Sequence, residues 1–269
     1  TILDNLSAQI HGEDYNLSPL YNSIKDKVNF IRGDVRNLSD WKKAIVNQNI
    51  IVHLAAETGT GQSMYEINKY VEVNISGTSH LLDYIANEPH QIKKIVVASS
   101  RAIYGEGKYQ CKDHGFVFPQ SRNEQDMENG QFEPTCPTCN KIVSMVETDE
   151  DSKVSPCSIY GITKYNQEQM VLVACKSLGV DASALRFQNV YGPGQSLSNP
   201  YTGILSIFST RILNNNPINI FEDGLESRDF VYIDDVVDAT ILAMFDKNSN
   251  ATAFNIGSGK STTVTKVAH

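Results

Sequence analysis

Residues 94–100 read Lys94-Ile-Val-Val-Ala-Ser-Ser100, a short apolar run that ends in two hydroxyl side chains. An apolar run of this length without polar alternation is typical of a parallel strand that is buried on both faces. Similar runs occupy residues 28–31, 50–54 and 182–187. We therefore interpret all four as buried strands of one parallel sheet.

Helical patterns separate these runs. Apolar residues between Val71 and Ile85 recur every three or four positions, which predicts a helix packed against the sheet. A longer helix is predicted from about Ser158 to Leu178, because Gly179 is a good C-terminal cap. The alternation predicts an α/β fold with a doubly wound parallel sheet, in which ligands bind at the carboxyl ends of the strands.

Two stretches interrupt the alternation. Residues 105–156 are polar and carry four prolines, which predicts an inserted lobe. After Pro193 the pattern is irregular, and it resumes with a predicted helix at 203–214, a strand at 219–221 and a helix at 234–245. This smaller C-terminal part is expected to cover the open edge of the sheet and to bind substrate.

The composition excludes several classes of protein. The chain has 269 residues of which 41% are apolar, enough for a substantial core. No run approaches the roughly 18 apolar residues of a membrane span. Thr1-Ile2-Leu3-Asp4 has neither a basic segment nor a cleavage site, so we expect no export. A net charge of −8 argues against a nucleic-acid surface, which needs clustered basic residues. We expect a cytoplasmic protein that binds neither membranes nor nucleic acids.

Tyr160-Gly-Ile-Thr-Lys164 places a phenol and an ammonium group on one face of the predicted long helix. A nearby positive charge lowers the pKa of a phenol from about 10, so that tyrosinate becomes accessible as a base. We predict that Ser100 binds a sugar hydroxyl and relays its proton to Tyr160, while Lys164 holds the cofactor ribose. The same spacing, in weaker contexts, also occurs at Tyr21/Lys25, Tyr65/Lys69 and Tyr104/Lys108.

The chain opens on Ile2-Leu3-Asp4-Asn5, which we interpret as the end of a strand. An acidic residue that ends the second strand of a dinucleotide-binding fold accepts hydrogen bonds from the adenosine ribose. Asp4 suits this role and would repel a 2′-phosphate, which favours NAD over NADP. An ordinary turn aspartate is the alternative interpretation.

These segments together resemble the extended short-chain dehydrogenases/reductases, specifically the NAD-dependent nucleotide-sugar epimerases and dehydratases. The matching segments follow the order of that family through nearly the whole chain. They are Leu3–Asn5, Gly33–Val35, His53–Ala56, Asn74–Thr78, Ser99–Gly105, Tyr160–Lys164, Arg186–Gly194, Arg228–Phe230 and Phe254–Gly257.

The resemblance implies a Rossmann-like, NAD-binding domain over residues 1–192 that carries the lobe at 105–156. Residues 193–269 would mainly bind substrate, with 229–257 returning to the Rossmann core. The family's first strand and glycine-rich turn do not precede Ile2, and its last elements do not follow Val264. A polypeptide made strictly of residues 1–269 is therefore expected to bind NAD poorly and to fold marginally.

The resemblance also implies roles for single residues. Asp34 and Val35 would contact adenine, Asn189 would meet the sugar-phosphate, and Arg228 would grip the diphosphate through its guanidinium. Taken singly, Asp34 also suits a turn, Asn189 a strand-end cap and Arg228 a surface ion pair. The full set of cofactor-binding residues would be Asp4, Asn5, Asp34, Val35, Leu54, Ala55, Ala56, Asn74, Ser99, Tyr160 and Lys164.

The residues after Ser100 indicate the reaction. Similar dehydratases carry Asp-Glu there, and similar decarboxylases carry a glutamate two positions on. Arg101 and Ala102 occupy these places, and neither can abstract a carbon-bound proton. We expect a 4-epimerase in which Tyr160 takes the 4-hydroxyl proton as hydride passes to NAD, giving a transient 4-keto sugar. The alternatives are an oxidoreductase or dehydratase of the same family, and a catalytically silent relative that binds nucleotide sugars.

The lobe indicates the substrate. Its segments at 105–109, 130–134 and 148–151 resemble those of thymidine-diphosphate-L-rhamnose 4-epimerases. This resemblance implies a dTDP-6-deoxyhexose as the substrate, with a UDP-hexose as the alternative, and we expect the enzyme to be a homodimer.

The lobe also carries three of the five cysteines. Cys136-Pro-Thr-Cys139 has a zinc-knuckle spacing, and Cys111-Lys-Asp-His114 offers a second pair of ligands. A polar lobe of this size lacks apolar residues for a core, so a metal would supply folding energy. We predict one structural zinc ion at these four residues, with unligated loop cysteines as the alternative.

Overall fold

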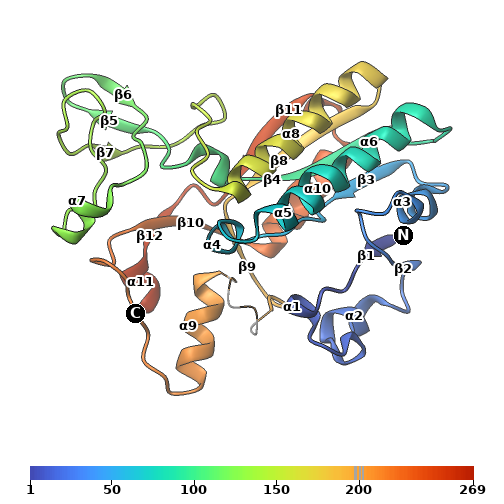
Figure 1. The fold of residues 1–269 in the computed structure, drawn as a ribbon, viewed down its shortest axis with the longest axis horizontal. Coiled ribbons are helices and arrows are strands. Elements are labelled where there is room, and N and C mark those ends of the chain that lie inside the picture. Colours follow the sequence, from blue (N-terminus) through green and yellow to red (C-terminus); the bar gives the residue numbers. More distant parts are fainter. Residues whose placement is uncertain (197–198, 200, 202) are drawn as a thin grey trace.

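The computed structural model of the chain describes residues 1–196, 199, 201 and 203–269. Its central layer is a four-stranded parallel sheet in the order β11-β8-β4-β3, with helices on both faces (Figure 1). The doubly wound α/β fold is therefore confirmed. The strands are β3 (Ile50–His53), β4 (Lys94–Ser100), β8 (Asp181–Phe187) and β11 (Thr252–Ile256).

Strand β4 shows why the sheet needs helices on both sides. Its seven residues are all buried, and successive side chains point to opposite faces. Ile95 and Val97 belong to the main core cluster, which also contains residues of α6 (Gly77–Asn87). Val96 packs with Leu185 and Ala243 in a second cluster, on the side of α10 (Ile233–Phe245).

The predicted long helix is α8 (Ile159–Leu178). The Ser158 side chain caps its first turn by accepting a hydrogen bond of 3.1 Å from the amide of Gly161. Gly179 ends the helix in the left-handed conformation with φ of 68°, as predicted. In Figure 1, α8 lies beside α6 over the same face of the sheet.

The chain begins with two parallel strands, β1 (Ile2–Asp4) and β2 (Phe30–Arg32), which form a separate small sheet. Strand β2 starts two residues later than the apolar run had indicated. The helices of this part are short. They are α1 (Ala8–His11), η1 (Tyr15–Leu17), α2 (Pro19–Ile24) and α3 (Leu38–Ile45).

The predicted helix near Val71 is composite. Two short helices, α4 (Thr60–Ser63) and α5 (Ile67–Tyr70), lead into a π-helical turn, η2 (Val71–Ser76), which continues as α6. A π-helical turn re-aims side chains relative to a regular helix and is frequent at functional sites. Here it carries Asn74.

The lobe predicted at 105–156 follows the 3-10 turn η3 (Arg101–Tyr104) and has its own antiparallel sheet, set apart from the main sheet in Figure 1. Its two ends meet, because the amide of Ser155 donates a hydrogen bond of 2.9 Å to the carbonyl of Ile103. The elements of the lobe are β5 (Tyr109–Cys111), β6 (Gly115–Val117), α7 (Glu124–Glu128) and β7 (Ser144–Met145).

The C-terminal part contains a mixed sheet in the order β12-β10-β9. The prediction of a strand at 219–221 is wrong, because these residues form no strand and Phe221 is 80% exposed. A turn begins instead at Glu222, which has a left-handed φ of 55°. The division of the chain at residue 193 stays a prediction. The remaining elements are β9 (Asn189–Tyr191), α9 (Ile204–Leu213), β10 (Ser227–Tyr232), η4 (Lys247–Ser249), β12 (Ser261–Thr263) and α11 (Val264–Ala268).

Among the helices of residues 1–196, 199, 201 and 203–269, none is both long and apolar enough to cross a bilayer.

Candidate active site

The structure brings Ser100 and Tyr160 together. Ser100 is the last residue of β4, and Tyr160 is the second residue of α8. The Ser100 hydroxyl interacts with the phenol and lowers the pKa of Tyr160. The Ser100 oxygen also accepts a hydrogen bond of 3.2 Å from the amide of Ala102, which fixes its position.

Two opposing effects act on the pKa of Tyr160. Burial raises the pKa of the phenol, whereas the hydrogen bond with Ser100 and the positive charge of Arg101 lower it. The balance lies above the usual pKa of tyrosine. The sequence pattern had assigned the lowering charge to Lys164, and the structure replaces it with Arg101.

Lys164 is buried and points along its own helix. Its Nζ donates a hydrogen bond of 2.7 Å to Oε1 of Gln167, three residues further on. Burial lowers the pKa of Lys164 to about 7, although the nearby carboxylate of Glu168 raises it. A ribose with two hydroxyl groups would give this ammonium group further hydrogen-bond acceptors.

The positive charge of Arg101 acts on the phenol, and the charge of Arg228 acts in turn on Arg101. Burial, and then the charge of Arg228, lower the pKa of Arg101 to about 10. Arg228 forms an ion pair with Glu226 and donates a hydrogen bond of 2.8 Å to the carbonyl of Ser227. In the described part of the chain, the Arg101 side chain has no hydrogen bond, so its donors are free for an anion.

Asn189 adds a second unused group. Its Oδ1 atom is buried and has no hydrogen-bond partner among the described residues. A buried carbonyl oxygen without a partner costs about 1–3 kcal/mol, so such atoms in folded proteins call for an explanation. A ligand hydroxyl would satisfy it, which agrees with the predicted contact to the sugar-phosphate.

A buried polar network lies behind the site. Ser99 donates a hydrogen bond of 2.6 Å to Oε2 of Glu168. Arg186 donates to both oxygens of the same carboxylate, from Nε to Oε2 at 3.0 Å and from Nη2 to Oε1 at 2.7 Å. Arg186 also donates to the Tyr104 hydroxyl at 2.6 Å. The hydroxyl of Ser99 thus donates its proton to helix α8, and its predicted contact with the cofactor stays a prediction.

This network was not predicted from the sequence, although the sequence of α8 carries a signal of it. Lys164, Gln167 and Glu168 recur at helical spacing behind Tyr160, and all three are buried. A polar stripe on the buried face of a helix needs partners, because a buried charge without one is costly.

The predicted adenosine-binding residues lie at the carboxyl ends of β1 and β2. Asp4 is exposed and Asn5 donates a hydrogen bond of 3.3 Å to Asp34, so the side chains form one polar edge. The ion pair with Arg36 holds the pKa of Asp34 at about 2. Val35 is buried in the main core, so its contact with adenine would be made by the main chain.

The residues after β3 supply an apolar surface. Leu54 is 57% exposed at the carboxyl end of β3, and Ala55 and Ala56 follow it, partly buried. Asn74 is fully buried behind them and holds the loop, because its Oδ1 accepts a hydrogen bond of 2.7 Å from the amide of Glu57.

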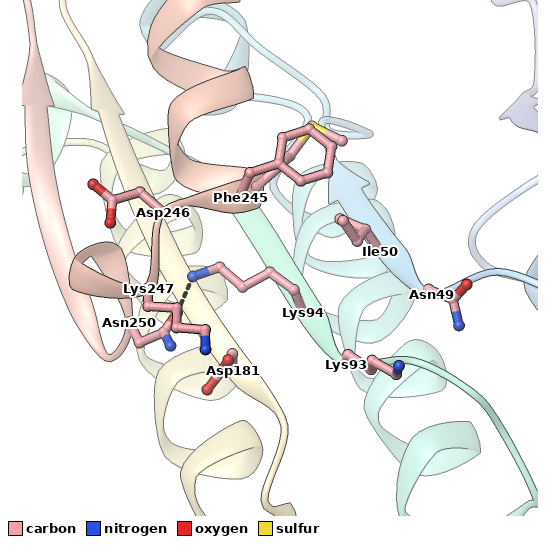
Figure 2. A pocket seen from close by; sticks show the side chains of 10 residues that line it. Asn49, Ile50, Lys93, Lys94, Asp181, Phe245, Asp246, Lys247 and Asn250 are labelled. Atoms are coloured by element: carbon pink, nitrogen blue, oxygen red, sulfur yellow. Dashed lines mark hydrogen bonds between the residues drawn. The ribbon is translucent and has the colours of Figure 1, made fainter.

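A hollow of about 230 Å³ is open at the other end of the sheet (Figure 2). It is lined by Ile50, Lys94 and Asp181, the first residues of β3, β4 and β8. The amino ends of the strands lie opposite the carboxyl ends that carry Ser100, so this hollow is separate from the candidate site.

Comparison with known proteins identifies the family of the chain. A model of the NAD dependent epimerase/dehydratase family matches residues 3–257. The chain is 37% identical to a dTDP-L-rhamnose 4-epimerase of Burkholderia thailandensis, over 99% of this chain and 72% of that protein.

Solved structures extend the comparison. The UDP-glucose 4-epimerase of Thermotoga maritima, solved with UDP-glucose, is similar with a TM-score of 0.74 and 30% identity, covering 99% of this chain and 71% of that one. A UDP-glucose 4-epimerase of Thermus thermophilus, solved with NAD, has a TM-score of 0.71 and 25% identity, with 99% and 72% covered. The resemblance noted in the sequence is confirmed: the chain belongs to the NAD dependent epimerase/dehydratase family.

Proposed function

We propose that the protein is an NAD-dependent nucleotide-sugar 4-epimerase that acts through a transient 4-keto sugar. The observation that carries this proposal is the contact of Tyr160 with Ser100, beside Arg101 in the place where a dehydratase would need an acid. Its relatives named as 4-epimerases support it.

In this mechanism the side chains of the protein transfer a single proton, first from the sugar and then back to it. The Tyr160 oxygen accepts the proton of the sugar 4-hydroxyl, with Ser100 as the relay between them. Bound NAD supplies a reversible hydride acceptor. When the keto sugar has turned its other face to the site, C4 regains the hydride that it lost and Tyr160 returns the proton to the 4-oxygen, so hydride and proton both balance without water or a second base.

The same residues explain how one nucleotide sugar is held while its sugar turns over. The guanidinium groups of Arg101 and Arg228 would bind the diphosphate, because planar guanidinium donors match phosphate oxygens. Asn189 would accept a hydrogen bond from the ligand through its unpartnered Oδ1. The sugar ring itself would have few fixed contacts and would be free to rotate.

We propose a dTDP-6-deoxyhexose as the substrate, with a UDP-hexose as the second candidate. The resemblance of the lobe to that of dTDP-L-rhamnose 4-epimerases supports the first, and a likeness to UDP-glucose 4-epimerases supports the second. The site residues Asp4, Asn5, Asp34, Leu54 and Asn74 are proposed for the NAD side.

The test is product analysis with a panel of nucleotide sugars, using mass spectrometry and NMR. For a substrate deuterated at C4, we expect a product that is epimeric at C4 and keeps the deuterium, because hydride returns within one active site. Accumulated keto product, loss of water from the sugar, or no turnover of any member of the panel would each contradict the proposal.

Two further properties are proposed. A homodimer is supported by helices α6 and α8, which lie side by side (Figure 1). The apolar side chains of Ile162 and Val173 in α8 are 42% and 66% exposed, and a second copy of the chain would cover them. A cytoplasmic location is supported by the three clustered thiols of the lobe, because thiols stay reduced in that compartment. Light scattering and cell fractionation test these two properties.

A further inference from the structure

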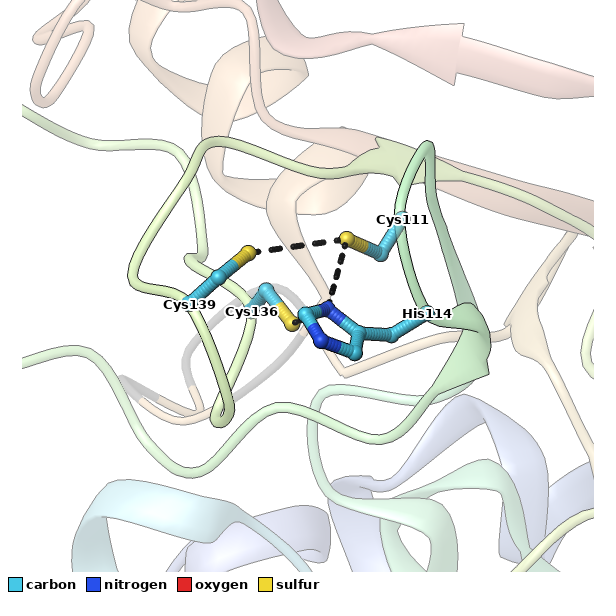
Figure 3. A group of neighbouring side chains, drawn as sticks. All are labelled: Cys111, His114, Cys136 and Cys139. Atoms are coloured by element: carbon cyan, nitrogen blue, oxygen red, sulfur yellow. Dashed lines mark hydrogen bonds between the residues drawn. The ribbon is translucent and has the colours of Figure 1, made fainter.

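The four predicted metal ligands converge in the lobe, apart from the candidate active site (Figure 3). One ligand atom from each of Cys111, His114, Cys136 and Cys139 lies within 4.8 Å of all the others. They come from segments separated in the sequence, so the folded lobe and not local spacing brings the two pairs together.

The two pairs are presented by similar turns. Cys111 and His114 flank the turn between β5 and β6, where Gly115 follows with a φ of 70°. Cys136 and Cys139 flank a second turn, where Asn140 follows with a φ of 57°. A residue in the left-handed region directly after each second ligand folds the chain back and aims both side chains of the pair inward.

The distances agree with a tetrahedral zinc site. Zinc–sulfur and zinc–nitrogen bonds of about 2.3 and 2.0 Å give tetrahedral edges of about 3.8 Å between sulfurs and about 3.5 Å between sulfur and nitrogen. Cys111 Sγ lies 3.7 Å from Cys139 Sγ and 3.6 Å from His114 Nδ1. Cys136 Sγ lies 3.6 Å from the same nitrogen.

The surroundings of the sulfur atoms also suit a metal. The backbone amides of Thr138 and Cys139 act on Cys136 and favour its thiolate form, which lowers the pKa of the thiol. Such outer partners orient a metal-bound thiolate and stabilise its negative charge. The separation of Cys111 and Cys139 is far beyond the roughly 2.05 Å of a disulfide bond, so these two sulfurs are not covalently linked.

The lobe needs such a cross-link. Its buried cluster consists of Tyr109, Val117, Val143 and the cysteines themselves. Three apolar side chains bury too little surface to hold a separate sheet, and small domains of this kind are commonly stabilised by a metal. We propose that Cys111, His114, Cys136 and Cys139 bind one structural zinc ion that holds the lobe together.

Four protein ligands leave no open position for substrate or water, so this ion has no part in the hydride and proton transfers. Its effect on the site would pass through contacts of the lobe with the rest of the molecule. Arg122 forms an ion pair of 2.6 Å with Glu222, and Asn255 of β11 donates a hydrogen bond of 3.0 Å to the carbonyl of Thr148.

Elemental analysis of the purified protein tests the proposal directly. We expect about one zinc per chain, removal by a chelator under reducing conditions, and recovery on adding Zn²⁺ alone. Replacement by Co²⁺ should give the intense visible bands of tetrahedral cobalt with thiolate ligands. Iron in place of zinc, or metal-free protein whose three lobe thiols react freely under native conditions, would overturn the proposal.

Variants separate metal binding from simple misfolding. The double variant Cys136→Ser/Cys139→Ser should lose zinc and make residues 105–156 sensitive to protease, while Cys157→Ser, at an exposed cysteine outside the cluster, keeps the metal. His114→Cys should retain zinc because it supplies a fourth thiolate, whereas His114→Ala should lower the affinity at least tenfold. Equal zinc affinity of His114→Ala and the unchanged protein, measured by competition with a chelator, would also count against the site.

Discussion

At the scale of single residues, one oxygen atom of Tyr160 carries the proposed proton transfer. Tyr160→Phe keeps the ring and its edge contact with Tyr70 but removes the transferable proton. We expect turnover to fall by roughly two to four orders of magnitude, with little change in substrate binding. Steady-state kinetics and calorimetry measure these two quantities. Tyr165→Phe, in the same helix, is the control, and near-normal turnover of Tyr160→Phe would rule out the assignment.

A second prediction at this scale concerns pH. Arg101 lowers the pKa of Tyr160 against the opposing effect of burial. Removing the charge in Arg101→Gln should raise the pKa of the phenol. The acidic limb of the profile of kcat against pH should then move to higher pH, because the deprotonated phenol forms only at higher pH. Arg101→Lys keeps a positive charge and should keep most of the profile. An identical profile in Arg101→Gln would show that its charge does not act on the base.

At the scale of elements, α8 meets η3 where there is no room for a side chain. A Cβ on Gly161 would lie 2.5 Å from the carbonyl oxygen of Ala102. Replacing a helical glycine by alanine usually stabilises a helix by about 1 kcal/mol, but here we expect Gly161→Ala to lower the melting temperature and the activity, since a backbone atom has to move. Gly61→Ala in α4, where nothing lies within 4 Å, should be neutral or stabilising. Unchanged activity in Gly161→Ala would show that the contact is not needed.

The elements also show what a sequence can reveal. Helix α8 was predictable because its cap residues Ser158 and Gly179 are local signals. The strand expected at 219–221 was wrong and β10 was not foreseen, because a short strand is decided by its partner, which in β10 is the distant β9. The π-helical turn before α6 has the apolar spacing of an ordinary helix, so the pattern does not distinguish the two.

In the candidate site, too, features set by local sequence were predictable and features set by distant partners were not. Ser100, Tyr160 and Lys164 were predictable, because the end of a strand and the start of a helix are visible in the sequence. The effect of Arg101 on Tyr160 and the pairing of Glu168 with Arg186 depend on which elements are neighbours in space. Spacing along the chain carries no information on those contacts.

At the scale of the whole molecule, the buried pair of Glu168 and Arg186 connects α8, β8 and η3. Glu168→Gln would leave the Arg186 charge buried without a counter-ion, and we expect a loss of about 3–5 kcal/mol in the free energy of unfolding. Urea denaturation measures it. Glu88→Gln breaks the exposed pair with Lys42 and should leave the free energy of unfolding nearly unchanged, because solvent screens such pairs. Equal effects of the two substitutions would contradict this view of the core.

The hydrogen bond between Ser155 and Ile103, which joins the two ends of the lobe, has a consequence for the order of folding. Ser100 and Tyr160 are far apart in the sequence, and bringing them together while the intervening chain is unfolded costs loop-closure entropy. That entropy grows by about 0.6 kcal/mol for each doubling of loop length. A lobe that has already folded presents its ends side by side and replaces this long loop by a short one. We therefore expect that, on a growing polypeptide, the lobe forms first and the serine and tyrosine meet afterwards.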